Sequence, residues 1–498
     1  MTNKALISSI EKRPISFMLN GEVIALTPDQ VDTTLLNWLR QSKRLTGSKE
    51  GCAEGDCGAC SVIITRKRPD GAIRHDAANA CILLLPMLDG LVLTTIEHIV
   101  GPQGELHPVQ EAMISHHGSQ CGFCTPGFVI SMVAGWRQKM TWSRQNIEDL
   151  VAGNLCRCTG YGPIIAAAES LAGEKPPHWE EARLKEEIAF LVGYGQAALN
   201  VGDERGFIAP QDVEGLSKTI LENLDAQIIA GATDIGLWVT KRHQIMPAFI
   251  SVMRVPELQE ITEDEKGYLI GCGVSHETAK DYLADAFPEL DELWRRFGSS
   301  QVRATGTVCG NLANGSPIGD LPPALLALGA SLIIRHGDEE RIIALDNFYH
   351  DYMVNNLKEG EWVKAVFIPK KSDNAHLMIH KISRRFDQDI SAVMGAFFYR
   401  LEDGKIAEAR IGFGGMAATP KRAIKTEAAI IGQAINDPLS DEILDQIEAD
   451  FTPIDDVRAS AAYRLNVAKA LLERSIEKAP LNLAGSGVDA LGVKGAAE

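Results

Sequence analysis

The chain has 498 residues, which is too long for one hydrophobic core and predicts three or four domains. Its 66 acidic and 49 basic residues give a formal net charge of −17, which argues against nucleic acid or another polyanion as a partner. No apolar run is long enough to span a bilayer and Met1–Leu19 lacks a secretory signal, so we expect a cytoplasmic protein without a membrane partner. Its ten cysteines then favour thiol or metal chemistry over structural disulfides.

The N-terminal part of the chain predicts a small β-rich fold with one helix. Residues 15–26 alternate around Asn20-Gly21, which is typical of a two-residue hairpin turn. A short helix is expected over residues 32–40, with Asp32 as its N-cap. Runs of β-branched residues predict strands that return to the same sheet, at residues 61–65 and 90–96.

Residues 51–60 pack three cysteines among three glycines. With one later cysteine they give the Cys-x4-Cys-x2-Cys…Cys spacing of plant-type ferredoxins. Glycine lets a loop wrap tightly around inorganic sulfide, because it has no Cβ and tolerates positive φ. We therefore expect a 2Fe-2S cluster, with a zinc site or a disulfide pair as the alternative. The four expected ligands are Cys52, Cys57, Cys60 and Cys81.

A second set of cysteines follows in a segment with helical period. Residues 108–114 and 127–134 predict helices, and a Cys-x2-Cys pair between them fits either a redox dithiol or a metal site. A Cys-x1-Cys pair further on supplies two more thiols, which a redox dithiol does not need and which suit zinc poorly. A second 2Fe-2S cluster is therefore favoured, held by Cys121, Cys124, Cys156 and Cys158.

These strings resemble the iron–sulfur portion of the molybdenum hydroxylases, the xanthine dehydrogenase and aldehyde oxidase group. The resemblance is carried by the two cysteine sets, by Gln-Cys-Gly-Phe-Cys-Thr-Pro-Gly at residues 120–127 and by Cys-Arg-Cys-Thr-Gly-Tyr at residues 156–161. It implies a β-grasp ferredoxin domain followed by a four-helix domain with the second cluster. It also implies that Gln120 contacts a pterin cofactor held elsewhere, with the second cluster nearest that pterin and the first relaying electrons to a flavin.

Two later segments suit a bound nucleotide. Residues 226–237 predict a strand, a glycine-containing turn and a helix, an arrangement that exposes backbone amides to a diphosphate. The spacing matches neither the dinucleotide nor the Walker motif, so an ordinary strand-turn-helix is the alternative. Residues 305–320 are dense in Gly, Asn, Ser and Thr, which can bind phosphates and ribose hydroxyls, although they could also form a long surface loop. The apolar run at 321–328 predicts a buried helix behind them.

The same family resemblance implies that these two segments embrace FAD and that Phe297 packs on the isoalloxazine. Residues 380–391 alternate basic and acidic side chains, which could be a solvated ion-paired face. In the family this stretch lies over the flavin, where Arg385 and Asp389 would set the local charge. Cys272 and Cys309 need not bind metal. The expected flavin-binding residues are Gln227, Ile228, Ile229, Ala230, Gly231, Ala232, Thr233, Asp234, Phe297, Thr307, Val308, Cys309, Gly310, Asn311, Asp320, Val363, Lys381 and Asp389.

We therefore expect a multidomain α+β protein. The paired prolines and dense charge of residues 174–187 predict a linker or an exposed helix, and the Gly- and Ala-rich end predicts a flexible tail. The expected parts are a β-grasp plant-type 2Fe-2S ferredoxin domain (1–98), a four-helix 2Fe-2S domain (99–172), a linker (173–204), an α+β FAD-binding domain (205–375), an α+β flavoprotein C-terminal domain (376–480) and the tail (481–498).

The resemblance implies the iron–sulfur and FAD subunit of a two-subunit xanthine dehydrogenase, because no molybdopterin domains follow in this sequence. Hypoxanthine and xanthine would be oxidised to urate on a separate molybdopterin-binding large subunit, contacted near Gln120, in an α2β2 heterotetramer; no catalytic residue for that hydroxylation is expected here. Because each cluster carries single electrons, FAD would collect a pair and reduce NAD. The alternatives are another molybdenum hydroxylase that oxidises an aldehyde or an N-heterocycle, a stand-alone reductase, and a redox-sensing iron–sulfur flavoprotein.

Overall fold

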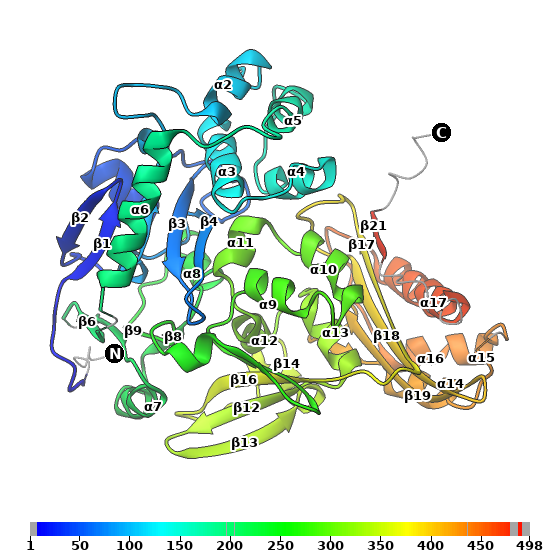
Figure 1. The fold of residues 1–498 in the computed structure, drawn as a ribbon. Helices are drawn as coiled ribbons and strands as arrows, with labels where there is room; N and C mark the ends of the chain where they lie inside the picture. Colours follow the sequence, from blue (N-terminus) through cyan, green and yellow to red (C-terminus); the bar gives the residue numbers. More distant parts are fainter. Residues whose placement is uncertain (1–6, 196, 204, 436, 479–486, 491–498) are drawn as a thin grey trace. The chain divides into compact units, whose positions relative to one another are not determined.

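The structure is a computed structural model that describes residues 7–195, 197–203, 205–435, 437–478 and 487–490 (Figure 1). The chain forms two compact units, of which the first comprises Met1–Gln259 and Ser299–Gly306 and the second Glu260–Gly298 and Thr307–Glu498. The expected FAD-binding domain therefore contributes residues to both units, and each unit is described by itself.

A five-stranded mixed sheet forms the N-terminal part of the first unit. Its strands are β1 (Ile15–Leu19), β2 (Glu22–Leu26), β3 (Ser61–Lys67), β4 (Ile73–Asn79) and β5 (Val92–Thr94), in the order β2-β1-β5-β3-β4. The predicted hairpin is confirmed, since β1 and β2 pair antiparallel and Asn20 (φ 52°) and Gly21 (φ 85°) form its turn. β5 is parallel to β1 and antiparallel to β3, which gives the expected β-grasp arrangement.

The predicted helix after the hairpin is present, but Asp32 is not its N-cap. Helix α1 covers Leu35–Asn37 and continues as the π-helical η1 over Trp38–Ser42. The side chain of Thr34 accepts a hydrogen bond from the Asn37 amide at 3.3 Å. Thr34 directly precedes the helix in the extended conformation that an N-cap needs, whereas Asp32 lies in the turn before it.

Four helices follow the sheet, as expected, and gather at one end of the first unit (Figure 1). The elements of this region are η2 (Leu85–Leu88), η3 (Ile96–His98), α2 (Pro108–Ser115), α3 (Thr125–Arg137), α4 (Arg144–Val151), α5 (Gly162–Glu169) and α6 (His178–Gly193). Helix α3 contacts β3 and β4 and is buried from Gly127 to its end, and most of its own residues are apolar, as a helix in a core requires. Helix α6 occupies the charged stretch that predicted a linker or an exposed helix.

The first unit also contains a four-stranded sheet, β6-β7-β9-β8. Its elements are β6 (Leu199–Val201), β7 (Phe207–Ala209), α7 (Val213–Glu222), β8 (Gln227–Ile229), α8 (Ile235–Thr240), β9 (Phe249–Ser251), η4 (Pro256–Gln259) and α11 (Ser300–Thr305). β8 and α8 confirm the predicted strand-turn-helix. Helix α11 belongs to this unit although the residues on both sides of it belong to the second unit.

The second unit begins with an antiparallel sheet in the order β10-β11-β16-β12-β13. Its elements are β10 (Ile261–Glu263), β11 (Gly267–Gly271), α9 (His276–Leu283), η5 (Pro288–Leu290), α10 (Asp291–Arg296), α12 (Val308–Asn314), α13 (Leu321–Leu328), β12 (Ser331–His336), β13 (Glu339–Ala344), η6 (Leu345–Asn347), β14 (Tyr349–Asp351), β15 (Val354–Asn355) and β16 (Trp362–Pro369). Helix α12 lies within residues 305–320, for which a long surface loop was the alternative to a nucleotide-binding segment. Every residue of α13 is buried, as its apolar sequence predicted.

A second sheet of this unit has the order β20-β19-β18-β17-β21. Its elements are β17 (Ala375–Ser383), β18 (Val393–Glu402), β19 (Lys405–Gly414), β20 (Lys421–Arg422), α14 (Ile424–Ile430), α15 (Asp441–Leu444), α16 (Gln446–Asp450), α17 (Ala461–Lys478) and β21 (Gly487–Ala490). β21 pairs parallel with β17, a strand that the composition of the predicted tail did not indicate. The rest of residues 481–498 lies outside the described residues.

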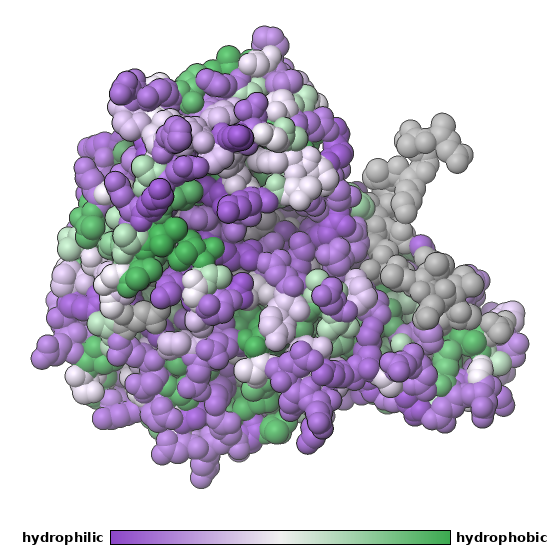
Figure 2. Space-filling model, in the orientation of Figure 1, coloured by the Kyte–Doolittle hydropathy of each residue, from purple (hydrophilic) through white to green (hydrophobic). Residues whose placement is uncertain are grey.

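Across the described ranges, no helix combines the length and apolar character that crossing a bilayer requires. Figure 2 shows mainly hydrophilic side chains on the displayed face, with smaller hydrophobic patches between them.

Candidate iron–sulfur and flavin sites

The first cysteine loop, residues 51–60, folds back on itself as a cluster loop must. Gly55 and Gly58 have φ values of 78° and 68°, which glycine adopts without strain. The sulfur of Cys52 accepts hydrogen bonds from the amides of residues 54, 56 and 57 at 3.3–3.4 Å. Amides directed at a ligand sulfur stabilise the thiolate, so this loop suits an iron–sulfur cluster.

The four predicted ligands of the first set lie together. Hydrogen bonds from Cys57 and then Cys81 lower the pKa of the Cys52 thiol, and these contacts raise the pKa of their partners. Cys60 bonds to Cys81, which lowers the pKa of Cys60. Cys60 and Cys81 are buried, whereas the other two are half-buried. The four thiols of this set share protons through their hydrogen bonds. Binding of iron would remove these protons and leave four thiolate ligands.

The second set forms two contacting pairs. Cys121 bonds to Cys158, which raises the pKa of Cys158. Burial, and then the contact with Cys156, raise the pKa of Cys124 to about 12. Burial of Cys156 opposes its ionisation, but hydrogen bonds from the Thr159 hydroxyl (3.2 Å) and neighbouring amides lower its pKa to about 7. The donors around Cys156 therefore favour a thiolate, the form that binds iron.

One edge of the second set is open to solvent. Cys121 and Cys158 are exposed, and so is Gln120, which precedes the first of them. Phe123 is 46% exposed, which is unusual for a large apolar side chain between two ligands. The residue that family resemblance assigns to a pterin contact thus lies on an accessible edge beside the second set.

The two cysteine sets are joined through the backbone. The amide of Leu155, next to Cys156, donates to the carbonyl of Cys57 at 3.0 Å. Asn154 donates from its side chain to the carbonyl of Gly58 at 3.2 Å. A Cβ on Gly58 would lie 2.2 Å from the carbonyl oxygen of Gly153, so only glycine allows this approach. The ligand loops of the two domains are therefore in direct contact.

The donor chemistry of both sets fits 2Fe-2S clusters. Eight thiols lie in two groups of four, and glycines and sulfur-directed amides surround the first group. Among the described residues, no three His, Cys, Asp or Glu side chains converge as ligands of a single metal ion. The remaining cysteines, Cys272 and Cys309, are both buried in the second unit, and burial raises the pKa of Cys272 to about 12.

Helix α8 brings the predicted diphosphate segment to the first cysteine loop. A Cβ on Gly236 would lie 2.6 Å from the carbonyl oxygen of Ile82, the residue after Cys81. At the other end of the helix, the ammonium of Lys241 donates to the carbonyl of Cys52. Because α8 directly follows residues 227–234, that segment lies next to the ligands of the first set.

The predicted flavin residues of the first unit form β8 and the turn after it. Residues 227–229 are the strand, and Ala232 has a φ of 59° in the turn. Burial raises the pKa of Asp234. Gly231 makes a close approach that the sequence did not indicate, since a Cβ there would lie 1.8 Å from the carbonyl oxygen of Thr305 in α11.

The predicted flavin residues 307–311 of the second unit form the start of α12. Thr307 is its N-cap, and its hydroxyl accepts from the amide of Gly310 at 3.1 Å. Cys309 is buried with its thiol 3.6 Å from the Ile270 carbonyl, which fits a packing role beside the cofactor. Asn311 has a buried side-chain oxygen without a hydrogen-bond partner among the described residues. Such an acceptor fits a hydroxyl of a bound flavin nucleotide.

Two predicted flavin residues bind each other instead of facing solvent. The ammonium of Lys381 lies 2.6 Å from a carboxylate oxygen of Asp320 and 3.0 Å from the carbonyl of Arg296. The two side chains are 1% and 7% exposed. Ser391 donates its hydroxyl to the same carboxylate. This buried pair, joining α13 to β17 and the end of α10, was not predicted.

The remaining predicted flavin residues are spread through the second unit. Phe297 ends α10 and packs on the ring of His276, with centroids 4.6 Å apart. Val363 is buried in β16. Asp389 accepts from the amide of Arg385 at 2.8 Å; burial opposes ionisation of this carboxyl, but these bonds lower its pKa. The guanidinium of Arg385 also forms an ion pair with Asp389 at 3.1 Å, so the ion pairing that was the alternative for this stretch is present at this pair.

Sequence reasoning missed a buried charge cluster between α3 and α6. Arg137 is 1% exposed and binds Glu180 at 2.7 Å and Glu187 at 3.3 Å. Burial raises the pKa of Glu187. Some of the charged side chains in the predicted linker are therefore buried. Their partner Arg137 lies at least 43 residues earlier in the sequence, so no local pattern indicates the ion pairs.

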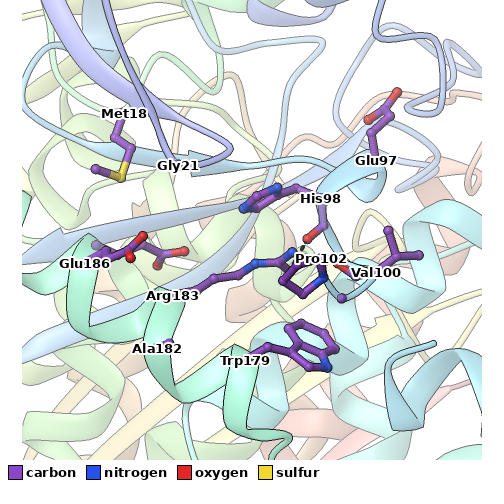
Figure 3. Close-up of a pocket in the computed structure, with 12 residues that line it drawn as sticks. Met18, Gly21, Glu97, His98, Val100, Pro102, Trp179, Ala182, Arg183 and Glu186 are labelled. Atoms are coloured by element: carbon purple, nitrogen blue, oxygen red, sulfur yellow. Dashed lines mark hydrogen bonds between the residues drawn. The ribbon is translucent and has the colours of Figure 1, made fainter. Parts of the chain in front are cut away.

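A cavity of about 480 Å³ lies between α6 and the sheet of the first unit, and none of its lining residues was a predicted site residue (Figure 3). Arg183 stacks on the Trp179 ring, 4.6 Å from its centroid, and donates to the carbonyls of His98 and Val100, each at 2.6 Å. Through these two hydrogen bonds the guanidinium of Arg183 holds α6 against the segment that follows β5.

Four domain models match the chain in order. They are a 2Fe-2S iron-sulfur cluster binding domain over residues 17–85, a [2Fe-2S] binding domain over 95–169, an FAD binding domain in molybdopterin dehydrogenase over 201–371 and a CO dehydrogenase flavoprotein C-terminal domain over 379–479. The predicted α+β architecture with two 2Fe-2S domains, an FAD-binding domain and a flavoprotein C-terminal domain is thereby confirmed.

Curated relatives agree with these models. The xanthine dehydrogenase of Drosophila subobscura is 32% identical over an alignment of 489 positions that covers 86% of this chain. The chain belongs to the molybdenum hydroxylase family. The xanthine dehydrogenase/oxidase of Gallus gallus is 28% identical over an alignment of 505 positions that covers 85% of this chain. The matched regions span only 36% and 37% of those two relatives.

Solved structures match part of the molybdenum hydroxylase chain. CO dehydrogenase from Oligotropha carboxidovorans has a TM-score of 0.51 at 26% identity, and the match covers 55% of this chain and 96% of that one. Quinoline 2-oxidoreductase from Pseudomonas putida 86 has the same TM-score at 24% identity, which shows the fold alone.

Proposed function

We propose that this chain is the electron-transfer subunit of a xanthine dehydrogenase. It would take electrons from a molybdopterin-binding partner that oxidises hypoxanthine and xanthine, carry them through two 2Fe-2S clusters to FAD, and reduce NAD in the cytoplasm. The observation that carries this proposal is the order of two 2Fe-2S domains and an FAD domain on one chain, together with xanthine dehydrogenases 28–32% identical over nearly its whole length.

The geometry of the first unit supports an electron path with two ends. The exposed edge at Gln120 and Cys121 suits docking of the partner, so electrons would enter at the second cluster. The bond from Leu155 to Cys57 connects the two ligand sets. The contact between Gly236 and Ile82 connects the first set to the predicted diphosphate segment, where electrons would leave for FAD.

The bound groups would supply the redox chemistry: each cluster passes one electron at a time, and the flavin collects two for transfer to the nicotinamide. The chain itself binds these groups and fixes their spacing. In this proposal Cys52, Cys57, Cys60 and Cys81 hold the first cluster, and Cys121, Cys124, Cys156 and Cys158 hold the second. The flavin-binding residues that the sequence predicts would hold FAD.

The deciding experiment purifies the chain with its copurifying large subunit. We expect an α2β2 assembly that contains molybdenum, four irons and one FAD per copy of this chain, and that reduces NAD when xanthine is added. A complex that contains molybdenum and all these groups but leaves xanthine unoxidised would contradict the proposal.

A second candidate is the matching subunit of another molybdenum hydroxylase. It is favoured by the match to CO dehydrogenase at 26% identity, a value close to those of the xanthine dehydrogenases. The same purified complex separates the two candidates, because an aldehyde or N-heterocycle oxidase would bleach the flavin with those substrates and not with xanthine.

A further inference from the structure

Helix α11 carries one buried glutamine into the junction of the two cysteine sets. Gln301 is 0% exposed, and its side-chain amide donates to the hydroxyl of Ser131 at 3.1 Å and to the side-chain oxygen of Asn154 at 3.2 Å. The hydroxyl of Ser61 lies 3.5 Å from the same nitrogen. Ser131 is on α3 and Ser61 begins β3, so one side chain bonds to both cluster domains.

The side-chain amide of Gln301 provides hydrogen-bond donors that its neighbours need. Ser61 donates its hydroxyl proton to the carbonyl of Gly58 at 2.7 Å, and Ser131 donates its own to Asn154 at 2.7 Å. Both hydroxyls have then used their only proton and can only accept. The N–H groups of Gln301 supply donors to these buried oxygens, and an apolar side chain would leave their acceptor lone pairs without a donor while each hydroxyl kept the bond that it donates.

The acceptors of Gln301 adjoin the cluster ligands. Ser61 follows Cys60, and Asn154 lies two residues before Cys156 and itself donates to the carbonyl of Gly58, next to Cys57. The space around the glutamine is also fixed, since a Cβ on Gly153 would lie 1.9 Å from its side-chain oxygen. Displacing Gln301 would therefore remove one link between the two ligand loops and leave only their direct bonds, from Leu155 to Cys57 and from Asn154 to Gly58.

The other end of α11 contacts the predicted diphosphate segment. The carbonyl of Thr305 is the atom that Gly231 approaches so closely, and the carbonyl of Ala304 accepts from Arg66 of β3. The six residues of α11 thus contact both ligand loops at one end and residues 227–234 at the other.

We propose that Gln301 is a positioning residue that fixes the distance between the two clusters, and that α11 extends this alignment to the flavin diphosphate segment. The inference rests on the proposed electron path, but it requires neither xanthine, NAD nor the partner. Removing a group that holds metal-binding loops in place commonly lowers activity by about tenfold or more, while the ligands themselves remain.

The test uses the whole chain as purified, reduced with dithionite, and frozen for EPR spectroscopy. Two reduced 2Fe-2S clusters are both paramagnetic, and their dipolar coupling falls steeply with distance. We expect Gln301→Leu to keep four irons per chain and to change the inter-cluster splitting. Asn200→Leu is the matched control, because Asn200 is another buried amide of the first unit and bonds to the carbonyl of Ile10 instead of a ligand loop.

A splitting identical to that of the unmodified chain in Gln301→Leu would overturn the proposal, and so would an equal change in Asn200→Leu. If Gln301→Leu does not retain iron, Ser131→Ala decides the question, since it removes one acceptor and leaves Gln301 in place; an unchanged splitting there overturns the proposal. An unmodified chain that binds fewer than four irons would instead refute the proposed function.

Discussion

The amide of Leu155 and the carbonyl of Cys57 form a hydrogen bond of 3.0 Å between two domains. Leu155 precedes Cys156, so one hydrogen bond and a short stretch of backbone separate a ligand of the second set from a ligand of the first. The bond depends on the close passage of Gly58 beside Gly153, where a Cβ would lie 2.2 Å from a carbonyl oxygen. Substitution of Gly58 therefore tests the contact.

Gly58→Ala is expected to lower both iron content and melting temperature. Gly104→Ala is the control, because Gly104 also has a positive φ (88°) but would meet no atom within 4 Å. Both variants carry the backbone cost of a left-handed alanine, about 1–2 kcal/mol. Only Gly58→Ala also forces the two loops apart, which adds about 1–3 kcal/mol of overpacking. Equal losses of iron and stability in the two variants would show that the contact between the loops is unimportant.

Cys52→Ser is expected to remove one cluster and leave the other. Its sulfur accepts three backbone amides and contacts two further thiols, so a serine at this position disrupts the first set alone. Iron analysis should find about two irons per chain, as one 2Fe-2S cluster requires. Cys272→Ser is the control, since this buried thiol of the second unit belongs to neither set. Retention of four irons in Cys52→Ser would contradict the ligand assignment.

The sequence predicted the cysteine sets but not what holds them together. Ligand spacing within a loop is a local property, and all eight thiols lie in the groups expected. The partners of Gln301 lie 147 residues or more earlier in the chain, and no local pattern indicates such contacts. For the same reason Glu180 and Glu187 looked like solvated charges, although Arg137 binds both in the interior.

The N-cap of the first helix was predicted wrongly because two neighbouring residues could play that role. Asp32 and Thr34 are both good N-caps, and only the backbone conformation before the helix decides between them. Lys381 and Asp320 were each assigned to the flavin by resemblance, and the sequence could not show that they bind each other.

Lys381→Met is expected to destabilise the second unit. The substitution leaves the Asp320 carboxylate buried without its ammonium partner, and breaking a buried pair in this way costs about 3–5 kcal/mol. In a calorimetric scan, this loss of stability would appear as a lower melting temperature of the transition in which the second unit unfolds. Lys218→Met is the control, because its pair with Glu222 is exposed at 3.8 Å and such pairs contribute little. An unchanged transition in Lys381→Met would mean that the pair does not support the fold.

His107→Asn is expected to make the free energy of unfolding depend less on pH below neutrality. The Nδ1 of His107 accepts from the Val109 amide at 3.1 Å and caps α2, which requires an unprotonated ring nitrogen. Burial lowers its pKa from 6.5 to about 4. Between these two pKa values the unfolded chain binds a proton at His107 that the folded chain does not. The contribution of neutral His107 to the free energy of unfolding is therefore complete above pH 6.5 and is lost as the pH falls toward 4.

At pH 5 this site alone should cost the unmodified chain up to about 2 kcal/mol relative to neutral pH. Asparagine also caps helices but does not titrate, so the quantity to compare is the change in unfolding free energy between pH 7 and pH 5, measured by denaturant titration. His116→Asn, at an exposed position, controls for loss of an imidazole. If His107→Asn loses as much stability between these pH values as the unmodified chain, titration of the His107 cap does not contribute to the pH dependence of stability.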